Sequence, residues 1–170
     1  METGEFLTRW TVRVALALFV VALLLRLRAA RRRSRLAQAR LAWTVGCAAF
    51  LLHVVCAFEF YHHWSHAAAY AATARQTAAV VGWNWGGGIY ANYLFALLWV
   101  ADGLWWWRGL EAYEMREPYV AWTVPGFMLF IAFNATVVFG QGPIRWFGLA
   151  AGALLLLALV GRSRAPAGQI

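Results

Sequence analysis

Cys56-Ala-Phe-Glu-Phe-Tyr-His-His-Trp-Ser-His66 lies where a long apolar run meets water. The stretch holds three of the four histidines of the chain and Glu59, the single acid of the second apolar run. On a continuous helix, Glu59, His63 and His66 would share one face, with His62 at its edge, because residues three and four positions apart are neighbours. The spacing therefore predicts a cluster of polar side chains at one end of a membrane-spanning helix.

The rest of the chain has the composition of a polytopic membrane protein. Its 170 residues are 63% hydrophobic, whereas soluble domains are about 45–50% apolar. Five apolar runs lie near residues 7–27, 40–61, 88–107, 119–139 and 145–161. Each reaches or approaches the roughly 20 residues that a helix needs to cross the hydrocarbon of a bilayer. The runs predict an all-α bundle of five transmembrane helices in a single membrane domain, residues 1–170.

The distribution of arginine predicts the orientation of these helices. All 15 basic residues are Arg, and seven of them fall within Arg26–Arg40, between the first two apolar runs. Because cytoplasmic loops concentrate positive charge, the N-terminus is expected outside and the C-terminus inside. The Arg26–Arg40 loop is expected to contact anionic lipid headgroups rather than nucleic acid. We expect a multi-pass protein of a bacterial inner membrane.

The segment between the second and third runs is predicted to be helical and external. Residues 66–79 are rich in Ala, the strongest helix former. Ser65 fits the N-cap of a new helix, so a bend is expected near Trp64 and Ser65. Such a bend would turn His66 towards the bundle. The three consecutive glycines Gly86–Gly88 would allow another element to approach closely.

The polar side chains of the opening stretch predict a transition-metal site at the external membrane face. Three imidazoles and a carboxylate are sufficient for one Zn, Cu or Fe ion. The predicted ligands are Glu59, His62, His63 and His66. The expected supporting residues, at a similar depth, are His53, Asn92 and Asn134. Haem is a weaker alternative, because all four His lie within 14 residues of a single segment.

Structural roles remain open for the same residues. Glu59 could be a hydrogen-bonded residue that seals the outer end of the bundle, and Asn92 and Asn134 could form hydrogen bonds between helices. Asp102 lies near the opposite membrane face and is expected to pair with Arg108 or with another cation of the helix-connecting loops. No nucleophile and base have a specific spacing, so the sequence leaves open whether a reaction is catalysed.

Two functions from different classes fit these observations. The first is a metal-binding membrane protein, with redox activity as one form of it. The second is a non-catalytic structural or assembly subunit of a larger membrane complex. Homo- or hetero-oligomerisation is expected through a small-residue face of the fifth run, formed by Gly148, Ala151, Gly152 and Ala153. A small transporter is a weaker alternative, because an odd number of helices shows no inverted repeat.

Overall fold

Every regular element in the described part of the chain is a helix. The structure is a computed structural model and describes residues 3–29 and 32–164. Arg31, one of the arginines expected to contact lipid, lies outside the described residues. The elements are α1 (Thr3–Leu27), α2 (Arg33–Ala57), η1 (Phe58–His62), α3 (His66–Val81), α4 (Gly88–Arg108), α5 (Leu110–Glu114), α6 (Pro118–Phe133), η2 (Asn134–Val138) and α7 (Pro143–Arg164), where η marks a π-helix. The prediction of an all-α fold is confirmed.

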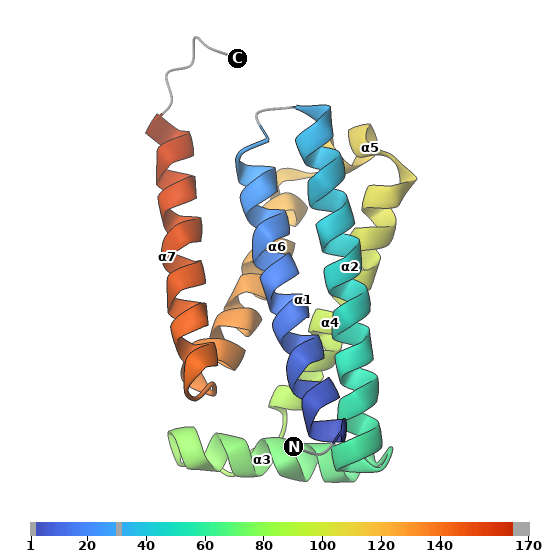
Figure 1. The fold of residues 1–170 in the computed structure, drawn as a ribbon, viewed down its shortest axis with the longest axis vertical. Coiled ribbons are helices and arrows are strands. Elements are labelled where there is room, and N and C mark those ends of the chain that lie inside the picture. The colour runs from blue at the N-terminus through green and yellow to red at the C-terminus, as the bar shows by residue number, and fades with distance from the viewer. Residues whose placement is uncertain (1–2, 30–31, 165–170) are drawn as a thin grey trace.

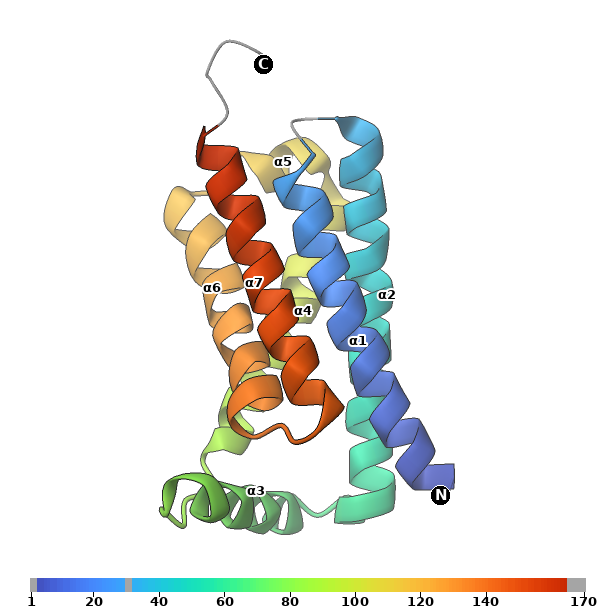
Figure 2. The same ribbon diagram turned by 60° about the vertical axis from the view of Figure 1, so that its left-hand side comes forward.

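Four candidate membrane spans occur within residues 3–29 and 32–164. They are α1, α2 continued by η1, α6 continued by η2, and α7, each long and apolar enough to cross a bilayer. α4 is of comparable length, with 21 residues, but it is not among these four candidates; it carries Asn92, Asp102 and several Tyr and Trp residues. α4 nevertheless lies in the same bundle as the four candidate spans (Figures 1 and 2).

Aromatic side chains fill the core between α1, α2 and α4. Trp99 of α4 is fully buried, and its ring centroid lies 5.4 Å from that of Phe19 and 5.6 Å from that of Trp43. Trp99 Nε1 also donates a hydrogen bond to the Trp43 carbonyl at 3.2 Å. Gly46 makes room for this ring, because a Cβ at that position would lie 3.1 Å from Trp99 Cζ2. The core therefore fixes α4 against the α1–α2 pair.

α7 packs on α1 and on η2, at the edge of the bundle (Figure 1). Gly148 and Ala151 are buried in this contact. A Cβ on Gly148 would overlap the Thr136 side chain. Ala153 is exposed, and a Cβ on Gly152 would meet open space. Half of the small-residue face expected to bind a partner is thus used within the chain, and oligomerisation stays a prediction.

The predicted bend after the second run is confirmed. η1 ends at His62, and His63 and Trp64 both have positive φ, 47° and 56°. Ser65 caps α3 by accepting a hydrogen bond from the Ala68 N–H at 3.2 Å. α3 then lies across the end of the bundle (Figures 1 and 2). We call this the α3 end and the opposite one, which carries α5, the α5 end.

Candidate functional site

The backbone between η1 and α3 is strained. The two consecutive non-glycine residues with positive φ, His63 and Trp64, follow directly on a five-residue π-helix. Left-handed backbone is unfavourable for side chains with a Cβ. Such conformations and π-turns are often found at functional sites. The strained turn therefore makes the α3 end a candidate binding site.

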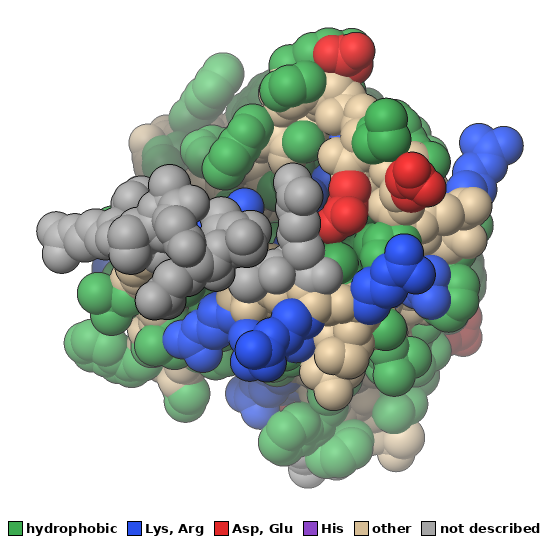
Figure 3. Space-filling model, turned by 90° about the horizontal axis from the view of Figure 1, so that it is seen from above, with side chains coloured by type: hydrophobic (Ala, Val, Ile, Leu, Met, Phe, Trp, Pro, Cys, Tyr) green, Lys and Arg blue, Asp and Glu red, His purple; other side chains and the backbone are tan. Residues whose placement is uncertain are grey.

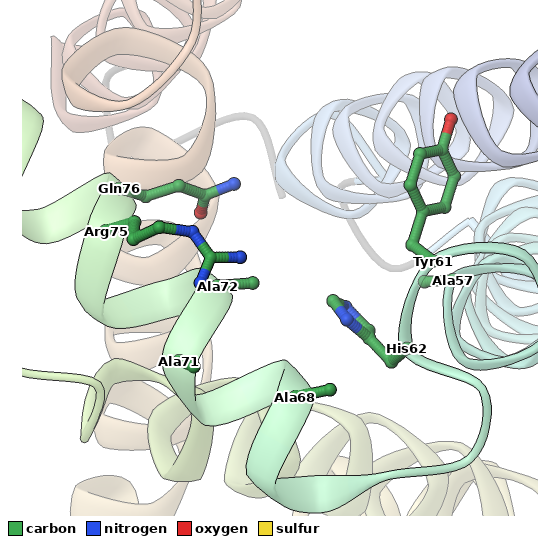
Figure 4. A pocket seen from close by; sticks show the side chains of 8 residues that line it. All are labelled: Ala57, Tyr61, His62, Ala68, Ala71, Ala72, Arg75 and Gln76. Carbon is green, nitrogen blue, oxygen red and sulfur yellow. The ribbon is translucent and has the colours of Figure 1, made fainter.

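An open pocket of about 390 Å³ lies between the end of the second span and α3. This volume is at the lower end of the range for small-ligand sites, about 300–1,000 Å³. The pocket is lined by Ala57, Tyr61, His62, Ala68, Ala71, Ala72, Arg75 and Gln76. Figure 4 shows Arg75 and Gln76 extending from α3, with His62 on the opposite side of the pocket. Ala68 and Ala72 of α3 lie between Arg75 and His62. The alanines leave room because they carry nothing beyond Cβ.

The polar part of the pocket is cationic. Arg75 is exposed, and the ion pairs of the described residues include no partner for it. His62 and Gln76 add further hydrogen-bonding groups on the two sides of the pocket. The unpaired Arg75 guanidinium and the additional hydrogen-bonding groups suit an anionic group of a ligand. The neutral apolar wall suits an apolar part of the same ligand.

α3 is held in place by contacts with α4 and with the loop before it. His66 Nδ1 lies 3.0 Å from the Tyr93 hydroxyl, and His66 Nε2 lies 3.4 Å from the Tyr90 hydroxyl. The close approach expected for the three glycines is also found. A Cβ on Gly86 would overlap Tyr70 of α3, so only glycine fits there without a shift. The pocket wall formed by α3 is therefore fixed on two sides.

The predicted metal ligands are used separately in this conformation. Glu59 Oε2 accepts a hydrogen bond from Trp64 Nε1 at 2.7 Å. His62 lines the pocket, His63 is exposed in the turn, and His66 contacts the two tyrosines of α4. Within residues 3–29 and 32–164, no group of three or more His, Cys, Asp or Glu side chains is arranged to hold a metal ion. The metal site stays a prediction.

Two of the three expected supporting residues have other contacts, and the third is exposed. His53 Nδ1 lies 2.9 Å from the Thr8 carbonyl oxygen and thus ties α2 to α1. Asn134 Nδ2 donates to the Phe130 carbonyl of its own helix at 2.8 Å, and Asn92 is exposed. The Asn134 bond is within one helix and does not join two.

A second polar cluster is buried at the α5 end. Asp102 Oδ1 accepts a hydrogen bond from Arg116 Nη1 at 2.5 Å, and Asp102 Oδ2 accepts one from the Tyr113 hydroxyl at 2.8 Å. The Arg116 guanidinium lies 3.8 Å from the centre of the Tyr113 ring, and Trp106 stacks on the same ring at 4.6 Å. Burial raises the pKa of Tyr113, so the phenol stays neutral and can donate.

The partner of Asp102 was predictable only as a class. A buried carboxylate requires a cation, and the loop alternative to Arg108 is confirmed, since Arg116 is the partner. Arg116 lies beyond α5, and Tyr113 lies within it. Helical spacing cannot select these residues, because the break at Gly109 determines where α5 and its loop pass.

The fold and its two polar ends define a helical bundle with several apolar helices compatible with a membrane protein. No protein-family model, curated protein or solved structure matches the chain.

Proposed function

We propose that the chain is an integral membrane protein with five spans, an external N-terminus and a cytoplasmic C-terminus. Eleven of its 15 Arg belong to the sequence segments next to the α5 end of the spans, namely Arg26–Arg40, the loops around α5 and the C-terminal tail; one of them, Arg31, lies outside the described residues. Figure 3 shows Arg side chains gathered on this end. Positive charge favours the cytoplasmic side. The α3 end would then face outside.

α4 fits a fifth span although it is not among the four candidates selected by length and composition. Its one acid, Asp102, is neutralised by Arg116, which reduces the cost of placing a carboxylate near hydrocarbon. Its last turn consists of Trp105–Trp107 and Arg108, residue types that suit the membrane–water interface. A span at α4 would also bring α3 and α5 to opposite membrane faces, which agrees with their positions at the two ends of the bundle.

At the external face, we propose that the pocket between η1 and α3 binds an anionic amphiphile such as a phospholipid. The observation that carries this proposal is the unpaired Arg75 beside an alanine-lined wall, opposite His62. An anionic headgroup would bind Arg75, and the apolar chains would follow the bundle surface into the membrane. The capped and tethered α3 supports the proposal, because a preformed wall lowers the entropic cost of binding.

A transition-metal site formed by Glu59, His62, His63 and His66 is the second proposal for this end. Glu59 and His62 precede the turn at His63–Ser65, His63 lies within it, and His66 follows it. A change of backbone angles in that turn would redirect several of the side chains together, and a metal ion could supply the required free energy.

Native mass spectrometry of the purified protein, titrated with dioctanoyl phosphatidylglycerol, tests the amphiphile proposal. Arg75→Gln should weaken binding about tenfold or more, since a charged hydrogen bond contributes roughly 1.5–3 kcal/mol. Ala72→Trp should fill the pocket and abolish binding there. The matched controls are Arg145→Gln, an exposed Arg outside the pocket, and Ala79→Trp, an exposed position of α3. Equal binding by all four variants would refute the proposal.

A further inference from the structure

Arg116 has a buried hydrogen-bonding edge without an acceptor. Its side chain is 1% exposed, and only Nη1 is engaged, with Asp102. Nε and Nη2 are buried and have no hydrogen-bond partner. Buried charged donors in folded proteins are almost always paired, so the two free N–H groups call for an acceptor.

The shape of this edge selects the chemistry of the acceptor. The Nε–H and Nη2–H bonds of a guanidinium point in the same direction and match the two oxygens of a phosphate or carboxylate. Trp106 Nε1, in the ring stacked on Tyr113, is a further buried donor without a partner. The cluster thus presents unpaired donors and lacks acceptors.

The net charge of the cluster also favours an anionic acceptor. Arg26 Nη1 donates to the Tyr113 hydroxyl at 3.3 Å, and the ion pairs of the described residues give Arg26 no carboxylate. Arg116 pairs with Asp102, and Arg26 contacts the cluster through Tyr113, so the two guanidinium groups and the one carboxylate leave an excess of one positive charge. The acids nearest in sequence are all exposed: Glu111, Glu114 and Glu117. A single bound anionic group would balance the buried Arg116–Asp102 pair and the partly buried Arg26 together.

We propose that the free edge of Arg116, with Arg26 beside it, binds a phosphate group at the α5 end. The phosphate could belong to an anionic phospholipid or could be free inorganic phosphate, and both present the same oxygens. Arg116 and Tyr113 both belong to the short segment from Gly109 to Glu117, so a movement of this segment would open the site. The site shares no residue with the pocket at α3.

Thermal unfolding in a maltoside detergent tests the proposal and separates the two sources. Inorganic phosphate is compared with chloride at equal ionic strength, and dioctanoyl phosphatidylglycerol with the corresponding phosphatidylcholine. Ligand at about 100 times its Kd should raise the midpoint by about 5–10 °C. A shift with phosphate alone identifies a free-anion site, and a shift with phosphatidylglycerol only identifies a lipid site. No shift with either ligand overturns the proposal.

Substitutions of two arginines at the same end, Arg26 and Arg28, test whether the shift in the unfolding midpoint arises at the proposed site. Arg26→Gln removes the second cation and leaves the buried Asp102 pair intact, so it should reduce the shift by at least half. Arg28→Gln removes an exposed charge at the same end and should keep the full shift. Equal losses in the two variants would refute the site. Asp102→Asn/Arg116→Gln, which removes one charge of each sign and leaves the net charge of the cluster unchanged, should lose the shift, and a shift retained by this folded variant would also refute the site.

Discussion

Asp102→Asn tests how strongly the α5 end depends on its buried ion pair. The substitution preserves the shape of the side chain but leaves the Arg116 guanidinium, 1% exposed, without a counter-charge. It also replaces one carboxylate acceptor of the Tyr113 hydroxyl by an amide. We expect a large loss of stability from this single change.

The magnitude follows from the burial of both partners. Two charges about 4 Å apart attract each other by about 4 kcal/mol at an effective dielectric constant of 20. Removing one member of a buried pair costs about 3–5 kcal/mol, because the other charge remains desolvated. Asp102→Asn/Arg116→Gln removes both charges and should lie within about 1–2 kcal/mol of the wild-type protein. The double variant should therefore be more stable than Asp102→Asn.

Denaturant unfolding in mixed micelles, followed by circular dichroism, measures these differences. The cycle requires the wild type, Asp102→Asn, Arg116→Gln and the double variant. Glu114→Gln, at an exposed position of α5, is the control for removing an acid from this end and should change stability little. If the two single losses are small, or if they simply add in the double variant, the buried pair is not the coupling that the geometry implies.

Three further substitutions probe other parts of the molecule. Gly148→Leu should destabilise the fold by about 1–3 kcal/mol or more, because it overlaps Thr136, whereas Gly152→Leu faces open space and should spare the fold; equal losses in thermal unfolding would contradict the packing of α7. Tyr113→Phe should flatten the alkaline limb of the stability curve: burial raises the pKa of Tyr113, so its contribution is intact below about pH 10 and is lost above it as the unfolded chain ionises first. Tyr119→Phe, at an exposed position, should leave that limb unchanged. Elemental analysis of wild type and His63→Ala, purified without chelators, decides the metal proposal: metal that is bound by the wild type and reduced in the variant supports it, and a wild type that cannot be loaded rules it out.

The sequence was sufficient where the local signal was strong. Ser65 after a crowded aromatic stretch, followed by an alanine-rich run, predicted both the bend and the start of α3, because capping and helix propensity act over a few residues. The three glycines before α4 predicted a close approach, and Gly86 provides it against Tyr70. These inferences needed no knowledge of the tertiary fold.

The candidate sites were less predictable, because they depend on the path of the chain. A common face for Glu59, His63 and His66 assumes a continuous helix, and the positive φ of His63 and Trp64 ends that continuity. The pocket residue Arg75 lies far from His62 along the chain and reaches it only because α3 turns back across the bundle end. Helical periodicity alone could not predict this change in the direction of the chain.

Labelling of single cysteines in intact cells tests the five-span orientation most directly. The variants are Ser34→Cys near the start of α2, Ala79→Cys on α3 and Ala112→Cys on α5, all exposed positions, in a background with Cys47 and Cys56 replaced by Ala. With a membrane-impermeant maleimide, Ala79→Cys should label in intact cells, whereas Ser34→Cys and Ala112→Cys should label only after permeabilisation. Labelling of Ser34→Cys but not Ala79→Cys in intact cells would reverse the orientation, and labelling of both Ala79→Cys and Ala112→Cys would show that α4 does not span.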